Sequence, residues 1–396
     1  MRKVIIAILS LLLLTSCWDL TEIEEIGFVL AVAIDPLSEE ELAEYKKQYK
    51  KETGQKARQM YKTSYQVVIP SMIVEEGAKL EDKAFFNIKT VGSTNFKMAR
   101  ITSARISRRL NFQQLKVIII DEHLLKTGDL AKFIDFYIRD HEMNRDTLVY
   151  VSKGGASEVL ETKLPLESMV ALSIKKIQDH YLQQHSMPAP KRIGEMATSV
   201  LDESSFIVPR IAAVGKELIM AGAAVILGGK NEMIGWLGEV DVMAHRLIVG
   251  EAKNLVIEGK VNEQLFDFEV DNFDSEINYQ LKEGQDFFEI NLRAEGFFVE
   301  NWLDDLAIGE EETNKKLEAA LEKEIERLAT EFVEKMQSEF QVDIFELGKI
   351  VKKKNYHRWK EMKENWDGED GYFSKANIEI NAEVKIRHQM IIEQLG

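Results

Sequence analysis

The chain has one cysteine, Cys17, and its position suggests acylation of the thiol. Cys17 ends the tetrapeptide Leu14-Thr15-Ser16-Cys17, which has the form of a lipobox and follows a basic pair and an apolar run from Val4 to Leu14. A basic start, an apolar run and small residues before a cleavage point make up a secretory signal. The sequence therefore predicts that Cys17 is the lipidation site, taking a diacylglycerol on its thiol, with cleavage between Ser16 and Cys17.

The apolar run is too short to remain as a membrane span. Its eleven residues reach roughly 16 Å as a helix, against about 30 Å of hydrocarbon in a bilayer. We expect residues 1–16 to be a cleaved signal peptide and residues 17–25 a lipid-anchored tether, whose freed amino group can take a further chain such as palmitate. An ordinary signal peptide with a chance cysteine at its end is the alternative.

Other residues that could take part in catalysis or metal binding belong to incomplete motifs. His141-Glu142 begins like a zinc-protease motif, but residue 145 is arginine and the second ligand is missing. Asp121-Glu122-His123 follows a predicted strand, where α/β enzymes often keep functional groups, yet a surface loop with ordinary charges is the favoured interpretation. The sequence contains neither G-x-S-x-G nor a P-loop. We therefore predict no catalytic residue, no metal site and no cofactor, and a protein that is not an enzyme.

Two further groups are candidate binding surfaces. A predicted helix from Asn95 to Leu110 carries the one locally basic stretch of the chain, made of Arg100, Arg105, Arg108 and Arg109. A phosphate or lipid-headgroup site is one interpretation, but we favour a solvated face whose arginines pair with neighbouring acids. Trp359 and Trp366 could form a carbohydrate or peptide platform, although a packing role is favoured.

The overall charge argues against nucleic acid as a partner. The 396-residue chain has a formal net charge of −16, and losing the two positive charges of Arg2 and Lys3 with the signal would leave −18. Sequence-independent binding to nucleic acid or to an anionic membrane surface needs clustered Lys and Arg. A hydrophobic content of 45% and only six prolines are typical of a folded chain. We therefore expect a folded protein held at the membrane by its lipid.

The elements that position these groups fall into two regions, which predict a mixed α+β fold with more than one domain. Residues 26–204 form the predicted N-terminal α/β region, as one unit or two subdomains. The apolar run from Ile26 to Ile34 is typical of a buried strand, and Ser38 with Glu41 forms a capping-box signature for a charged helix that ends near Gly54.

A strand-helix-strand unit follows in this region. Val117 to Ile120 is β-branched, residues 130–138 show the apolar spacing of a helix with one buried face, and residues 147–151 return to a strand pattern. This succession favours a crossover with parallel pairing. The proline-bounded segment Met187-Pro188-Ala189-Pro190 is a candidate linker or hinge.

Residues 205–396 are predicted to form a C-terminal domain in which an antiparallel sheet packs on a long helix. The hairpin-like turn Gly228-Gly229-Lys230-Asn231 separates two strand-like segments near its start. Apolar residues from Leu317 to Met336 recur at spacings of three and four, with Glu and Lys on the outer face. Residues Ile378 to Ile386 alternate apolar and polar, which is typical of a half-buried strand in an antiparallel setting.

Several segments of the sequence resemble a known family. Cys17-Trp18-Asp19, Glu22-Ile23 and the run from Gly27 to Asp35 are similar to the mature start of the Ger(x)C spore germination lipoproteins, the C subunits of germinant receptors. The similarity continues in collinear order through segments 92–109, 115–120, 139–160, Val208-Pro209-Arg210-Ile211, Gly222-Ala223-Ala224, Asp343-Ile344-Phe345, Trp359 and Trp366.

The resemblance implies a three-part α/β protein anchored on the outer face of the cytoplasmic membrane of a spore former, the spore inner membrane. It implies that the protein acts together with two integral-membrane partner subunits in nutrient-triggered germination. It implies no catalytic role. It leaves open which germinant is sensed and whether this subunit binds that small molecule. Two departures are the charged insertion from Ser38 to Gly54 and Gln113-Gln114, where the family has a histidine.

Two other classes remain as alternatives. A solute-binding or adhesion lipoprotein would also be anchored, but the solute-binding kind should show two similar lobes around a cleft, and the sequence has no internal repeat. A lipid-anchored hydrolase should carry a recognisable nucleophile or metal set.

Overall fold

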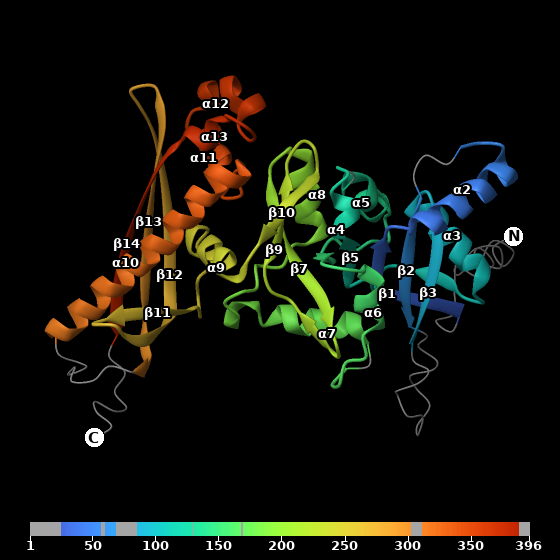
Figure 1. Ribbon diagram of the computed structural model, residues 1–396, viewed down its shortest axis with the longest axis horizontal. Coiled ribbons are helices and arrows are strands. Elements are labelled where there is room, and N and C mark those ends of the chain that lie inside the picture. The colour runs from blue at the N-terminus through green and yellow to red at the C-terminus, as the bar shows by residue number, and fades with distance from the viewer. Residues whose placement is uncertain are drawn as a thin grey trace, which may run out of the picture.

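Two β-sheets lie one beyond the other along the long axis of the protein in this computed structural model (Figure 1). The structure describes residues 25–56, 60–68, 85–128, 130–167, 169–301 and 311–387. The predicted signal peptide, Cys17 and the tether up to residue 24 lie outside these ranges. The mixed α+β fold class predicted from the sequence is confirmed.

The first sheet is mixed, with parallel strands at its centre. Its strands are β1 (Ile26–Asp35), β2 (Tyr61–Val68), β3 (Phe85–Gly92), β4 (Arg109–Asn111), β5 (Val117–Asp121), β6 (Leu148–Ser152), β7 (Phe206–Val214), β8 (Glu217–Ile219), β9 (Ala223–Leu227) and β10 (Glu232–Leu237). Their order is β10-β9-β7-β6-β5-β1-β2-β3, with β4 beside β1 and β8 beside β7. Strands β1, β5, β6 and β7 run parallel, so the predicted crossover from β5 to β6 is confirmed.

Helices cover both faces of the first sheet, because its central strands are apolar on both sides. The helices of this half are α2 (Glu39–Thr53), α3 (Asn95–Arg105), α4 (Glu122–Leu125), α5 (Leu130–Arg139), α6 (Ala156–Glu161), α7 (Val170–Asp179) and α8 (Ile193–Leu201). One apolar core packs α3, α5 and α8 against one face, and a second core packs α6 and α7 against the other. The buried sheet thus presents its functional candidates only at strand ends and edges.

The charged segment between the first two strands folds as the solvated helix that the sequence predicted. Ser38 Oγ accepts from Glu41 N while a carboxylate oxygen of Glu41 accepts from Ser38 N, which is the predicted capping box. Gly54 closes α2 in the left-handed conformation, and no residue of the helix is buried. The helix is therefore an addition to the sheet and not part of its core.

The second sheet packs on the long helix, as expected. It consists of β11 (Val256–Val261), β12 (Gln264–Lys282), β13 (Gln285–Asn301) and β14 (Asn377–Arg387), and the helices of this half are α9 (Glu239–Ile248), α10 (Glu311–Lys335), α11 (Leu347–Lys354), α12 (Tyr356–Met362) and α13 (Tyr372–Lys375). Strands β11, β12 and β13 are antiparallel neighbours. The apolar stripe of α10 is buried in the core between helix and sheet.

Strand β14 corrects one expectation, since it pairs with β13 in parallel and not in an antiparallel setting. The chain between them passes through α10 to α13, and a parallel pair requires such a long crossover connection. The free edge of β14 is covered by α10: carboxylates of Glu318, Glu322 and Glu326 accept from the backbone N–H groups of Ile386, Val384 and Ala382 at 3.0, 3.1 and 3.0 Å. These glutamates occupy backbone N–H groups at a sheet edge that could otherwise pair with another strand.

The first sheet continues past residue 204, where the sequence predicts a domain boundary. Strands β7 to β10 extend the first sheet as far as Leu237. The reason is that β7 pairs in parallel with β6 while β9 and β10 continue as a hairpin on its other side. We call the part up to Leu237 and the part after it the two sheet-based parts, and the domain boundary at residue 204 stays a prediction.

The segment at residues 187–190 is not a hinge between domains. Met187 is buried in the core under α7, and Gln178 Nε2 donates to the Pro188 carbonyl at 3.2 Å. The carbonyl of the preceding Ser186 accepts from Gly222 N at 2.9 Å. The prolines therefore terminate one helical region while the segment stays packed on the first sheet.

Candidate functional site

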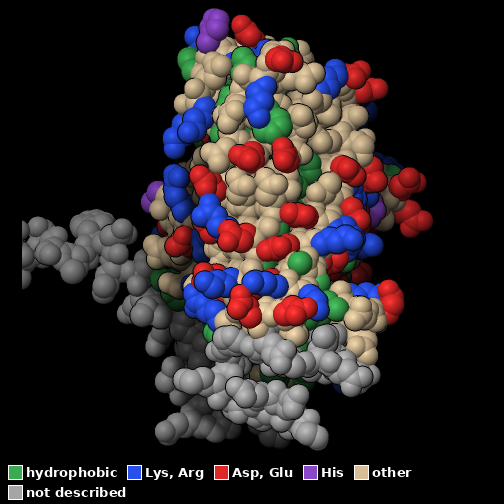
Figure 2. Space-filling model, turned by 90° about the vertical axis from the view of Figure 1, so that its left-hand side faces the viewer, with side chains coloured by type: hydrophobic (Ala, Val, Ile, Leu, Met, Phe, Trp, Pro, Cys, Tyr) green, Lys and Arg blue, Asp and Glu red, His purple; other side chains and the backbone are tan. Residues whose placement is uncertain are grey.

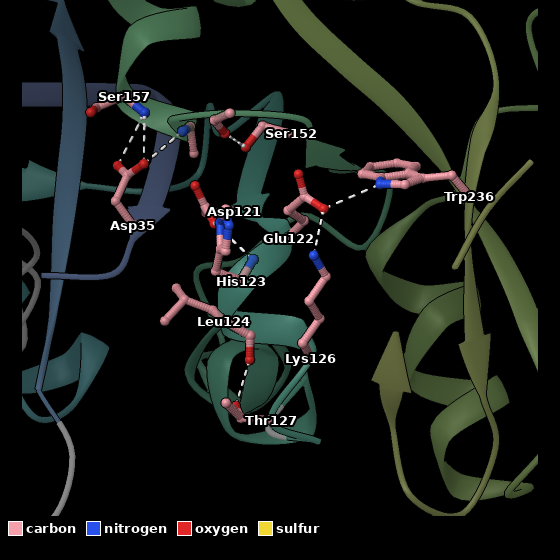
Figure 3. A network of polar contacts seen from close by, with 12 residues as sticks. Asp35, Asp121, Glu122, His123, Leu124, Lys126, Thr127, Ser152, Ser157 and Trp236 are labelled. Atoms are coloured by element: carbon pink, nitrogen blue, oxygen red, sulfur yellow. Dashed lines mark hydrogen bonds and ion pairs between the residues drawn. The ribbon is translucent and has the colours of Figure 1, made fainter. Parts of the chain in front are cut away.

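A cluster of carboxylates lies at the carboxyl ends of β1 and β5, the place where parallel sheets often hold ligands (Figure 3). Asp35 ends β1 and accepts from Ala156 N at 2.6 Å and from Ser157 N at 3.0 Å, which fastens the start of α6. Burial raises the pKa of Asp35, although these two N–H groups oppose the rise. Asp35 therefore works as a buried cap for α6.

The triplet that the sequence singled out sits beside Asp35. Asp121 caps α4 by accepting from His123 N at 2.8 Å, and the His123 ring contacts the same carboxylate through Nδ1 at 2.8 Å. Glu122 lies between Lys126 Nζ, at 2.9 Å, and the indole N–H of Trp236 from β10, at 3.2 Å. Asp121 and Glu122 are buried, so the expectation of a surface loop is wrong for them.

The carboxylates of this cluster have structural roles. Burial opposes the charge of Glu122, but hydrogen bonds from Lys126 and Trp236 outweigh it and lower the pKa of that carboxyl. Ser152 Oγ, on the neighbouring strand, donates to the Gly154 carbonyl at 2.7 Å. Each carboxylate in Figure 3 thus has donors from the protein itself, and they tie β1, β5 and β10 to α4 and α6.

The histidine at the incomplete protease motif is exposed. His141 lies 3.8 Å from Asp140, while Glu142 contacts Arg109 at 3.5 Å. Among the described residues, no group of three His, Cys, Asp or Glu side chains is placed to hold a metal ion.

Most arginines of the basic stretch do not form the ion pairs that the sequence analysis favours. Arg109 pairs with Glu142, but within the described part of the chain no carboxylate lies within ion-pair distance of Arg100, Arg105 or Arg108. Arg100 lies over the ring of Phe96 and Arg105 donates to the Lys89 carbonyl at 2.9 Å. The expected pairing with neighbouring acids therefore fails for most of this stretch.

The two tryptophans pack, as favoured from the sequence. Their rings meet edge to face at 5.6 Å, and Gly348 leaves the room for them, since a Cβ at Gly348 would lie 2.9 Å from atoms of both rings. Trp366 is buried, and its indole N–H donates to a carboxylate oxygen of Asp343 at 2.8 Å. A flat ligand platform is excluded by this arrangement.

A second pair of acids joins the two sheet-based parts and was missed by sequence reasoning. Asp343 accepts from Phe345 N at 3.0 Å and from Gly348 N at 2.7 Å, in addition to Trp366. Asp367 accepts from Asp343 N at 2.7 Å and from the Ser205 hydroxyl at 2.5 Å. Ser205 precedes β7 and also accepts from Gly228 N at 2.9 Å, so one short network links the first sheet to the helical end of the second part.

This junction borders a cleft of about 590 Å³ between the two parts. Its walls carry both signs of charge, among them Glu203, Lys349 and Lys352. No sequence motif marks Asp343 and Asp367, because the two acids stand 24 residues apart and meet only through the fold. Burial, then the charge of Asp343, raises the pKa of Asp367 to about 7.

The raised pKa makes the junction sensitive to pH. A carboxyl whose pKa rises on folding gives its full stability below its ordinary value of 3.8 and loses it as the pH climbs toward 7. We expect wild-type protein to lose about 2–3 kcal/mol of unfolding free energy relative to Asp367→Asn between pH 5 and pH 8. Urea unfolding across this range measures it, with exposed Glu369→Gln as control. Parallel pH curves for wild type and Asp367→Asn would contradict the assignment.

Comparison with known proteins gives two consecutive matches. Residues 19–213 match the family model described as Spore germination protein N-terminal domain, and residues 221–390 match Spore germination B3/GerAC like, C-terminal.

Among the described residues, none of the helices combines the length and apolarity that crossing a membrane requires.

Curated relatives span nearly the same length. Spore germination protein YndF of Bacillus subtilis is 26% identical over 97% of this chain and 95% of that protein. Spore germination protein A3 of the same organism is 24% identical over 97% of each chain. The solved structure titled Crystal Structure of the GerBC protein superposes with a TM-score of 0.59 at 20% identity, covering 83% of this chain and 94% of that one, which shows the shared fold. The two family matches follow one another and take in most of the sequence, so the chain belongs to the Ger(x)C family of spore germination proteins.

Proposed function

We propose that this protein is a lipid-anchored subunit of a spore germinant receptor and acts by assembly with membrane-embedded partner subunits. The observation that carries the proposal is the pair of consecutive spore germination matches over residues 19–213 and 221–390. Cys17, which lies outside the described residues, is the proposed lipid site. The proposed location is the outer face of the spore inner membrane.

The geometry supports assembly over catalysis. The buried carboxylates at the strand ends and at the domain junction accept from backbone N–H groups and structural side chains. They hold elements together, and the hydroxyl from which Asp367 accepts, that of Ser205, itself accepts from Gly228 N as part of the structural network. We therefore propose that the protein transmits or stabilises a state of its partners and carries out no reaction itself.

Confinement at the membrane would strengthen such an assembly. A subunit tethered in the plane of its partners meets them at a high effective concentration, so a modest contact can keep the complex together. A solute-binding lipoprotein would instead need two similar lobes. The two parts differ here, because the first sheet has a parallel centre with helices on both faces and the second is a four-stranded sheet on one long helix.

Removal of the gene tests the proposal. Spores lacking only this protein should lose the germination response to one set of small nutrients and keep the responses that other receptors mediate. The measurement is germination scored separately for each nutrient. An unchanged response to all of them, with related subunits also removed to exclude redundancy, would contradict the proposal and favour a binding lipoprotein.

A further inference from the structure

One side of the N-terminal half concentrates positive charge in an otherwise acidic protein. Between Ser93 and Ile120 the chain has six Lys or Arg residues and no Asp or Glu, while the whole chain has a net charge of −16. Helix α3 carries three of the six, and its inward residues are buried against β3 and α5. The basic residues therefore point away from the core, on the outward face of α3.

Within the described part of the chain, the three cations of α3 have no acidic partner. Lys97 lies over the Tyr49 ring at 5.1 Å, Arg100 lies over the Phe96 ring at 5.1 Å, and Arg105 donates to backbone and hydroxyl oxygens. No ion pair of Arg108 is found within the described ranges. Positive charges held by rings and neutral oxygens remain free to attract an anionic partner.

Helix α2 extends the same surface. The contact between Lys97 and Tyr49 brings α2 and α3 side by side at one end of the molecule (Figure 1). From Tyr45 to Thr53 the helix has four lysines and one glutamate, and all four lysines are exposed. The opposite end of the molecule, shown in Figure 2, has acidic and basic side chains interspersed over its described surface.

Apolar side chains lie among these charges. Phe96 is 53% exposed and Ile101 is 36% exposed, both on the outward face of α3, and Tyr45 of α2 is 36% exposed. Exposed aromatic and aliphatic residues beside Lys and Arg are typical of a surface that sits at a lipid headgroup boundary.

The basic surface ends beside the point where the chain arrives from Cys17. Strand β4 starts at Arg109, which pairs with Ile26 at the start of β1, and a Cβ placed on Gly27 would lie 3.5 Å from Arg108. The nine residues from Cys17 to Glu25 reach at most about 30 Å when extended. The tether is thus short enough to keep α3, itself about 16 Å long, close to the membrane.

We propose that the outward face of α3, with Arg108 and the lysine-rich end of α2, binds anionic lipid headgroups and orients the protein on the membrane. This inference rests on the proposed anchor at Cys17. The acidic bulk of the protein does not prevent the contact, because charges farther than about 8–10 Å are largely screened at physiological salt. The C-terminal half then projects away from the bilayer toward solvent or partners.

The test uses the mature chain carrying Cys17→Ser, so that binding does not depend on acylation. The protein is sedimented with vesicles of phosphatidylcholine alone or with added phosphatidylglycerol. We expect binding only to the anionic vesicles and a fall in affinity as salt rises. The double variant Arg100→Gln/Arg108→Gln should bind about 25-fold more weakly, since each cation near the surface is worth about fivefold.

The matched control is Arg293→Gln/Arg327→Gln, which removes the same charge from the C-terminal half. It should bind like wild type, and Phe96→Ser should weaken binding with no change in net charge. Circular dichroism establishes that each variant is folded. Equal binding to both vesicle types, no binding at low salt, or equal losses in test and control variants would overturn the lipid assignment. Fatty-acid labelling at Cys17 is measured separately, so failure of the anchor and failure of this surface are distinguishable.

Discussion

Asp343→Ala should lower the unfolding free energy of the protein by about 3–5 kcal/mol, because it leaves three buried donors without an acceptor. Those donors are the backbone N–H groups of Phe345 and Gly348 and the indole N–H of Trp366, which all reach Asp343 within 2.7 to 3.0 Å. The carboxylate is buried, and water has little access to replace it. Urea unfolding followed by tryptophan fluorescence measures the loss, since Trp366 reports on this region directly.

Two variants make that experiment specific. Glu369→Ala changes an exposed acid in the same segment and should shift the unfolding free energy by less than about 0.5 kcal/mol. Asp343→Asn keeps the size of the side chain but places an NH₂ group against donors, so its loss should be intermediate. A loss below about 1 kcal/mol for Asp343→Ala would show that the network does not hold the C-terminal helices in place.

Cys17→Ala should remove the protein from the membrane fraction and abolish its lipid labelling. Two acyl chains give stable anchoring, whereas the variant would retain only the charge-dependent contact proposed for α3. Membranes are therefore washed at high salt, which screens that contact, before the protein is measured. Fatty-acid labelling and fractionation of spore membranes give the result.

The control for this experiment is an anchored protein with a weakened lipid surface. Arg100→Gln/Arg108→Gln should remain labelled and stay in the washed membrane fraction. A Cys17→Ala protein that is processed, unlabelled and still retained after the wash would contradict the anchor.

Much of the fold was predictable because strong local patterns decide it. The apolar run from Ile26, the capping box at Ser38 and Glu41, and the stripe on α10 each have a period or a cap that fixes one element. Parallel pairing of β5 and β6 followed from the helix between them, since a crossover is required.

Pairing between distant strands was not predictable from those patterns. The alternation in β14 shows a half-buried strand but not its direction, and the residues of β13 with which it pairs lie about 90 positions earlier. The glutamates of α10 looked solvent-facing in the helical spacing, yet three of them accept from the edge of β14. The extension of the first sheet past residue 204 was not predictable for the same reason, because only sheet pairing reveals that β7 to β10 belong to it.

The polar networks show the same limit. Asp121 and Glu122 were recognised as strand-end residues, but the sequence does not show that the indole N–H of Trp236, far along the chain, donates to Glu122. Asp343 and Asp367 carry no motif, and their roles arise from meeting Ser205 and Trp366 in the folded protein. Such networks satisfy buried polar groups, and a single sequence does not reveal which groups the fold will bury.

Co-purification of the tagged protein from detergent-solubilised spore membranes tests assembly with membrane-embedded subunits most directly. Wild-type protein should bring down two integral-membrane partners from the same spores, and Cys17→Ala should recover them in reduced amount when the folded domains are equally abundant. An unrelated lipid-anchored protein with the same tag serves as control. Recovery of wild-type protein without any membrane-embedded partner, under conditions that preserve other membrane complexes, would contradict the account.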